Sequence, residues 1–165
     1  MTIRLGVTVV LSVLAITGCG GAATGSDGGG ATDASVGCNS TAIPTTPVTD
    51  TMGAGAEPAP LGGPIVDGTY FLSAHEHYAP GTADGMTYRA VLLVTGTTAT
   101  IAQIRNAGAE ERFNLAVTTT LTAFHAVSTC PVAGTALDFD AYTATPTTLA
   151  LFNSSNHTVV TFTLH

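Results

Sequence analysis

Apolar and polar residues alternate along most of the chain after residue 65, and this pattern constrains the fold more than any other feature. Residues 110–119 illustrate it, because Phe113, Leu115 and Val117 alternate with polar neighbours. Successive side chains of a β-strand point to opposite faces, so the alternation predicts half-buried antiparallel strands. We predict eight strands, near residues 67–78, 86–95, 97–105, 110–119, 121–129, 137–145, 147–153 and 157–164.

Short turn sequences separate the expected strands, as at residues 95–97 and 106–108. Tight turns between consecutive strands favour an up-and-down antiparallel β-barrel, whose interior is filled by side chains or holds one small ligand. A β-sandwich is the alternative, because the connections around residues 78–86 and 130–137 are long enough for crossovers. The prediction is therefore an all-β domain over residues 64–165.

The N-terminus has the features of a bacterial targeting segment. Arg4 supplies a positive charge, and the apolar run over residues 5–16 has the length of a signal-peptide core but is too short to span a membrane. Residues 16–19, Ile-Thr-Gly-Cys, resemble the lipobox of bacterial lipoproteins. The resemblance implies that residues 1–18 are a signal peptide, that Cys19 is lipidated, and that the protein is anchored in the cell envelope.

The residues after the lipobox predict a tether. Gly20, in place of Asp, resembles the outer-membrane sorting pattern of Gram-negative lipoproteins, with the leaflet left open. Residues 19–63 are rich in Gly, Ala, Pro and Thr, so we expect a lipidated Cys followed by a flexible segment that does not fold by itself.

The charge of the chain limits its partners. Eleven Asp and Glu residues stand against four Lys and Arg residues, for a net charge of −7. Such an acidic surface argues against nucleic acids and anionic lipid headgroups as partners. We therefore expect the N-terminal lipid to make the membrane contact.

The three cysteines suggest one disulfide. Lipidation would use Cys19, which leaves Cys38 and Cys130 to pair in an oxidising compartment, with two buried or free thiols as the alternative. A bridge between Cys38 and Cys130 would hold the chain against the domain and shorten the free tether to residues 20–37.

Four short segments carry a further resemblance: residues 67–72 (DGTYFL), 94–98 (VTGTT), 129–131 (TCP) and 142–145 (YTAT). With the Leu residues that follow the last of them, they are similar to lipocalin-like lipoproteins of uncharacterised function that are common in soil bacteria such as myxobacteria. Tyr70 stands where true lipocalins carry a Trp. The resemblance implies a barrel, and the inward residues expected to line a ligand cavity are Leu72, Leu92, Phe113 and Phe162.

His75 and His77 are the most suggestive polar residues. At alternate positions of a strand they would point to one face, about 7 Å apart, and could share a metal ion, although zinc would need one or two further ligands. The simpler interpretation is a polar strand end, so we predict no resident metal or cofactor. The chain has no nucleophile elbow, phosphate loop or zinc-protease motif, so we assign no catalytic residue.

The leading functional hypothesis is a lipid-anchored envelope protein with a non-catalytic β domain that binds a small apolar ligand or a partner protein. A surface adhesion or assembly module is the second hypothesis, and it predicts an exposed apolar patch or an unprotected edge strand. A metal-binding protein or hydrolase is the third, and it requires His75, His77 or His125 to converge with Asp138 or Asp140. The oligomeric state is not predicted.

Overall fold

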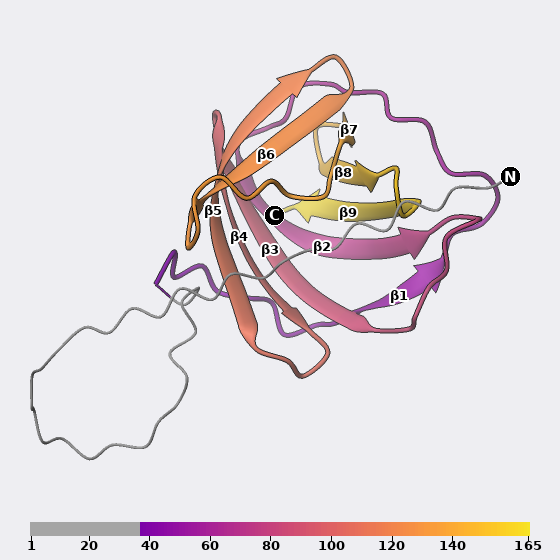
Figure 1. Ribbon diagram of the computed structural model, residues 1–165, viewed down its shortest axis with the longest axis horizontal. Helices are drawn as coiled ribbons and strands as arrows, with labels where there is room; N and C mark the ends of the chain where they lie inside the picture. The colour runs from indigo at the N-terminus through magenta and orange to yellow at the C-terminus, as the bar shows by residue number, and fades with distance from the viewer. Residues whose placement is uncertain (1–36) are drawn as a thin grey trace, which may run out of the picture. The chain divides into compact units, whose positions relative to one another are not determined.

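The computed structural model describes residues 37–165 of the chain. Within this range the chain forms β-strands and no α-helix (Figure 1). The described residues therefore contain no helix that is long and apolar enough to cross a membrane. The all-β prediction is confirmed. The strands are β1 (Val48–Met52), β2 (Gly68–His77), β3 (Thr87–Thr95), β4 (Thr98–Arg105), β5 (Glu110–Thr120), β6 (Ala123–Cys130), β7 (Ala141–Ala144), β8 (Thr148–Asn153) and β9 (Thr158–Leu164).

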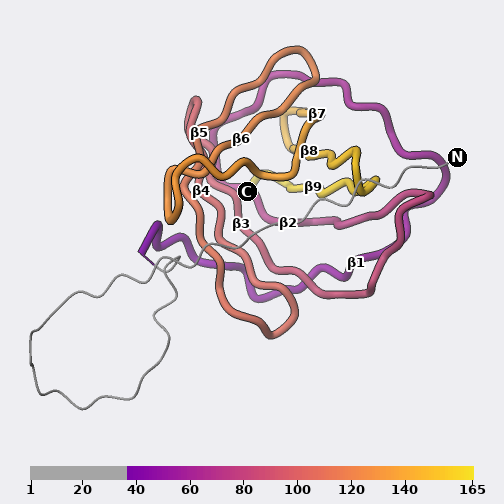
Figure 2. The backbone as a smooth tube through the Cα atoms, in the orientation of Figure 1, coloured from indigo at the N-terminus to yellow at the C-terminus, as the bar shows by residue number. Residues whose placement is uncertain are grey.

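The strands form one sheet that closes into a ring. They follow one another in chain order, and β2 pairs with β9 as well as with β3. All neighbouring pairs from β2 to β9 are antiparallel, and the curved path of the backbone is visible in Figure 2. Strands β2 to β9 correspond in order to the eight strands predicted from the alternation.

The strand expected at residues 137–145 is shorter than predicted, because only β7, Ala141–Ala144, is regular. The residues before it still lie along β6: the Leu137 amide donates to the Ala126 carbonyl, and the Phe124 amide donates to the Asp140 carbonyl. Backbone groups of this segment find hydrogen-bond partners on β6 at irregular intervals. The alternation of side chains therefore persists although the segment does not form a regular strand.

Strand β1 lies in the stretch 19–63 that composition placed in the flexible tether, and this part of the tether prediction is wrong. Strands β2 and β3 pair directly only where Gly68–Phe71 faces Val91–Val94. Beyond that point β1 separates them, parallel to β2 at Asp50–Met52 and antiparallel to β3 at Val48–Thr49. The ring therefore supplies the hydrogen-bond partners that let a Thr- and Pro-rich segment form a strand.

Gly62 fills a second gap, between β6 and β7, which pair directly at Ala123 and Ala141. The Gly62 amide donates to the Tyr142 carbonyl, and its own carbonyl accepts from the Ala144 amide. A Cβ atom at position 62 would lie 2.2 Å from the Leu121 carbonyl oxygen, and φ is +68°, so only glycine fits here. Residues 38–64 are thus built into the ring at two places.

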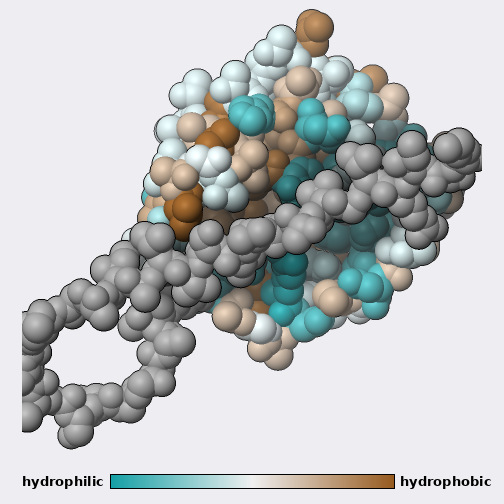
Figure 3. All heavy atoms as spheres, viewed as in Figure 1, coloured by the Kyte–Doolittle hydropathy of each residue, from teal (hydrophilic) through white to brown (hydrophobic). Residues whose placement is uncertain are grey.

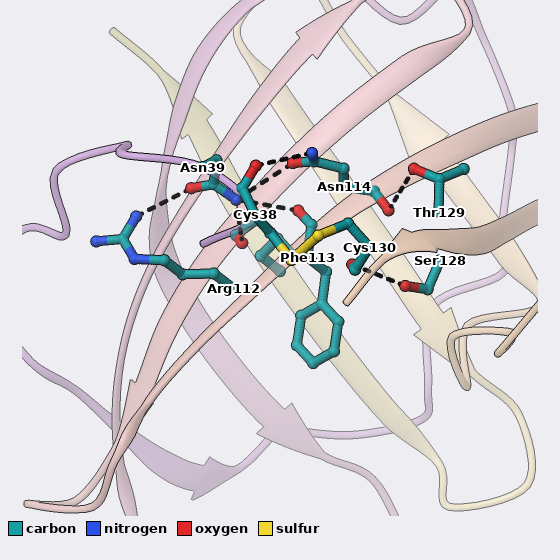
Figure 4. Close-up of a disulfide and its surroundings, with 9 residues drawn as sticks. Cys38, Asn39, Arg112, Phe113, Asn114, Ser128, Thr129 and Cys130 are labelled. Carbon is teal, nitrogen blue, oxygen red and sulfur yellow. Dashed lines mark hydrogen bonds between the residues drawn. A yellow bond between two sulfur atoms is a disulfide. The ribbon is translucent and has the colours of Figure 1, made fainter. Parts of the chain in front are cut away.

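The predicted disulfide between Cys38 and Cys130 is present, and it fixes the start of this segment to the end of β6 (Figure 4). Asn39 next to it donates to the Phe113 carbonyl at 3.2 Å. The Arg112 guanidinium donates to Asn39 Oδ1 and to the Thr41 carbonyl, at 2.9 and 2.8 Å. The chain is therefore held against β5 by covalent and hydrogen bonds together.

The hydrophobic core occupies the inside of the ring. Its most deeply buried large side chains are Tyr70, Leu149 and Phe162, each at most 2% exposed. The Tyr70 hydroxyl donates to the Val66 carbonyl at 2.6 Å, so burial leaves no polar atom of this side chain without a partner. Burial of each such side chain stabilises the fold by about 2 kcal/mol.

Candidate functional site

Two cavities lie inside the ring, near its opposite ends. One, of about 500 Å³, lies towards the turn that joins β3 to β4. The other, of about 450 Å³, lies towards the turn that joins β4 to β5. Ile101 and Leu137 line both, so the two cavities meet at one layer of the core. Both fall within the range of about 300–1,000 Å³ typical of small-molecule sites.

The first cavity, called here the apolar cavity, has no charged side chain among its lining residues. Leu92, one of the four residues predicted to line a ligand site, is among them. Its apolar lining includes Ile65, Val94, Leu115, Val117, Leu149 and Leu151. This surface can take up an apolar molecule without stripping water from a charge.

The second cavity, called here the polar cavity, combines an apolar wall with a charged rim. Leu72, Phe113 and Phe162, the other three predicted residues, form part of the wall. The rim residues that carry or can carry a charge include His75, His77, Asp84, Arg105 and Glu111. The four residues predicted to line one ligand cavity therefore line two different cavities.

A β-bulge in β2 turns His75 and His77 toward the polar cavity. Leu72 faces Phe162 of β9, but Ala74 faces Thr161, so one extra residue, Ser73, is inserted in β2. Such an insertion moves every later side chain to the opposite face of the strand. Without the bulge, the two histidines would share the outer face with Phe71.

Asp50 of β1 lies behind the two histidines, with no exposed side-chain surface. Its Oδ1 accepts a hydrogen bond of 2.8 Å from His75 Nδ1 and lies 3.4 Å from His77 Nε2. Its Oδ2 accepts from the Asp84 amide at 2.9 Å. The donor atoms of Asp50, His75 and His77 all lie within 4.8 Å of one another.

Contacts from β9 and β3 orient both imidazole rings. The His77 Nδ1 atom lies 3.1 Å from the Thr158 hydroxyl, which also lies 3.4 Å from the Asn156 carbonyl. The hydroxyl can donate a hydrogen bond to Nδ1 or accept one from it, according to the tautomer of His77. The His75 ring stacks on Tyr88, with centroids 4.2 Å apart and planes within 4°.

The electrostatics keep Asp50 ionised. Burial raises the pKa of Asp50, but hydrogen bonds from the Asp84 amide and from His75, with the neighbouring His77, outweigh it and lower the pKa below its usual value. Burial and the charges of Asp84 and Asp50 raise the pKa of Tyr88, so Tyr88 remains a neutral phenol beside the site. The cluster is thus a carboxylate facing two imidazoles.

The other predicted chemistry-bearing residues do not join this cluster. His125 is exposed on β6, and a further histidine, His157, lies 2.8 Å from Glu57 through its Nδ1 atom. Asp140 accepts from the Ser154 amide at 3.0 Å, whereas Asp138 lines the polar cavity elsewhere on its wall. The carboxylate that meets the histidines is Asp50, not either acidic residue of the third hypothesis.

Cys19, the predicted lipidation site, lies outside the described residues.

Asp50 is the site residue that sequence reasoning missed. Val48, Asp50 and Met52 do alternate with Thr49 and Thr51 in a strand-like pattern. An acidic residue at the central inward position removed the apolar signal, and the surrounding composition favoured a tether. A charged residue at an inward position of an alternating segment was the one available clue.

Comparisons of the chain with protein-family models, with curated proteins and with solved structures found no match.

Proposed function

We propose that the protein is a lipid-anchored component of the cell envelope, whose ring of strands is a lipocalin-like up-and-down β-barrel. The barrel binds a small apolar ligand in the apolar cavity and performs no catalysis. The single observation that carries the proposal is a cavity of about 500 Å³ inside the ring with no charged residue in its lining. A site of this size and chemistry selects ligands by shape and apolar surface.

The strand pairing favours ligand binding over the adhesion hypothesis. Each of β2 to β9 has a hydrogen-bonded partner on both sides, and the Gly62 contact reinforces the weakest junction. Edge-to-edge assembly needs an unpaired strand, which the described part of this ring does not offer.

The exposed apolar residues also favour ligand binding over adhesion. Leu61, Leu121 and Val132 are the most exposed large hydrophobic side chains among the described residues. Leu61 and Leu121 belong to adjacent loops, because Gly62 approaches the Leu121 carbonyl, whereas Val132 follows β6 in a different connection. On the face shown in Figure 3, the most hydrophobic side chains are dispersed among hydrophilic ones. An adhesion module would present them as one patch.

A matched pair of Trp substitutions tests the ligand site. Val117 lines the apolar cavity, whereas Val127 lies between the buried, inward-facing Ala126 and Ser128 on the outer face of β6. The protein would be purified from the membranes of the producing cell, and its bound small molecules extracted and identified by mass spectrometry. We expect an apolar compound to co-purify with the wild type and with Val127→Trp, and to be lost from Val117→Trp.

Two results would refute the ligand proposal: no compound bound to folded wild-type protein above the detergent background, or equal retention by both Trp variants. Circular dichroism checks that each variant is folded. The chain contains no Trp, so each substitution also adds a single fluorophore whose emission reports the polarity of its site. Emission from Val117→Trp should be blue-shifted relative to Val127→Trp.

The anchor is tested by the intact mass of the native protein. We expect the mass of residues 19–165 plus acyl groups, with two thiols appearing only after reduction. A mass without acyl groups would remove the envelope role, and it would leave the ligand site unaffected.

A further inference from the structure

We propose that Asp50, His75 and His77 form a binding site for a divalent transition-metal ion of the zinc type. The proposal concerns the polar cavity and is independent of ligand binding in the apolar cavity. The spacing of His75 and His77 pointed to two of the three residues but not to the third, because the carboxylate comes from β1 and the two imidazoles come from β2, 25 and 27 positions further along the chain.

The first argument is electrostatic. The Asp50 Oδ1 atom lies 2.8 Å from His75 Nδ1 and 3.4 Å from His77 Nε2, and the carboxylate has no exposed side-chain surface. A divalent cation among these three atoms would be attracted by the carboxylate charge and by one lone pair from each neutral imidazole. The fold therefore brings three atoms that can ligate a metal ion to one position.

The second argument is geometric. Zinc lies about 2.1 Å from imidazole nitrogen and carboxylate oxygen, so neighbouring ligands in a tetrahedral site are about 3.4 Å apart. The Asp50–His77 separation of 3.4 Å already has this value. The Asp50–His75 contact of 2.8 Å must lengthen by about 0.6 Å, as the ion replaces the Nδ1 hydrogen and that proton moves to Nε2.

The third argument is the support behind the ligands. The non-ligating Oδ2 of Asp50 is held by the Asp84 amide, and the non-ligating Nδ1 of His77 by Thr158. Hydrogen bonds of this kind fix the orientation of metal ligands and set the imidazole tautomer. The bulge at Ser73 and the insertion of β1 between β2 and β3 bring all three side chains together.

The donor set selects the class of metal. Two imidazoles and one carboxylate suit first-row transition ions, whereas calcium and magnesium prefer oxygen ligands alone. Both cysteines of the described residues are in the disulfide, so they offer no thiolate. Because His75 and His77 line the polar cavity, the fourth coordination position faces that cavity and is open to water or to a bound molecule.

The test measures binding of Zn²⁺ and Co²⁺ to the tag-free full chain, with Cys19→Ser removing the one cysteine outside the disulfide. Isothermal titration calorimetry should give one ion per chain for the wild type. His77→Ala and Asp50→Asn should each weaken binding at least tenfold. Thr158→Val should weaken it about tenfold, since it removes a supporting hydrogen bond. The control His125→Ala removes an exposed histidine of β6 and should leave binding unchanged.

A second measurement covers variants that fail to fold. X-ray absorption of the zinc-loaded wild type should show two imidazole ligands, additional oxygen or nitrogen ligands and no sulfur. Imidazole NMR signals of His75 and His77 alone should shift on zinc binding. The proposal is wrong if the wild type binds no stoichiometric ion at neutral pH, if folded His77→Ala and Asp50→Asn keep wild-type affinity, or if the absorption spectrum shows fewer than two imidazoles. In those cases the three side chains form a hydrogen-bonded cluster without a metal ion.

Discussion

Removal of the Cys38–Cys130 disulfide should destabilise the domain by an amount that follows from its position in the chain. The two residues are 92 positions apart, and the loop between them contains β1 to β5 and nearly all of β6. In the chain-entropy model, closing a loop of this length lowers the entropy of the unfolded chain by about 16 cal/mol/K, or about 4.6 kcal/mol at 25 °C. This is a large part of the 5–15 kcal/mol that typically stabilises a domain.

The assay is urea denaturation of the double variant Cys38→Ala/Cys130→Ala against the wild type. With a denaturant slope of about 2 kcal/mol/M, the midpoint should fall by about 2 M. Wild-type protein reduced before unfolding is the control, because it loses the bond without any change in side-chain volume. The native ring should persist in both, since Asn39 and Arg112 still hold the segment against β5.

A loss smaller than about 1 kcal/mol in both samples would refute the loop-entropy argument. It would mean that the unfolded chain remains compact enough for residues 38 and 130 to stay close without the bond. A large loss in the double variant alone would instead assign the effect to the side-chain replacement.

Three further predictions concern the ring itself. Deletion of Ser73 removes the bulge and reverses the faces of the following residues of β2, so the chain should fail to give the wild-type circular dichroism spectrum. Leu149→Ala should cost about 2–5 kcal/mol of unfolding free energy, because Leu149 is 1% exposed, whereas Leu121→Ala at 88% exposure should cost less than about 0.5 kcal/mol by the same denaturation assay. Burial raises the pKa of Asp140, but hydrogen bonds from Ser154 outweigh it and hold the pKa below the usual value. The ionised Asp140 carboxylate therefore stabilises the fold above its unfolded pKa, and this stabilisation is lost as the pH falls through its native pKa. Asp140→Asn should therefore lose less unfolding free energy on acidification than the wild type. An equal loss of unfolding free energy in both proteins would contradict the argument.

The disulfide also determines where any pull from the membrane anchor would enter the domain. Under the proposed anchoring, force on the chain reaches Cys38 first and passes through the bridge to the end of β6. Strand β1, which carries Asp50, lies beyond that point in the chain. The bridge therefore isolates the carboxylate of the candidate metal site from the tether.

The strands β2 to β9 and the disulfide could be predicted because their signals are local or a matter of counting. Alternation in segments such as Phe113–Val117 reflects the geometry of a single strand, so it does not depend on which neighbouring strand pairs with that segment. The pairing of Cys38 with Cys130 could be predicted once Cys19 was assigned to lipidation, because two cysteines then remain. The four predicted cavity residues line cavities for the same reason, since inward positions follow from the alternation.

The sequence indicated that His75 and His77 could share a metal ion, but the complete site could not be predicted, because it depends on contacts between segments far apart in the sequence. Nothing local shows that β2 and β3 diverge after Phe71, which is what makes room for β1. The bulge at Ser73 is defined only against β9, and it alone turns His75 and His77 inward.

The sequence by itself therefore determined the all-β class, the order of the eight ring strands and the covalent link that closes the N-terminal segment, because periodicity and cysteine count carry that information. Only the tertiary structure decided that the Thr- and Pro-rich segment joins the sheet and that Asp50 meets two histidines. The physical reason is that a strand needs partners for its backbone, and a buried carboxylate needs partners for its charge. Both kinds of partner are supplied by other parts of the folded chain.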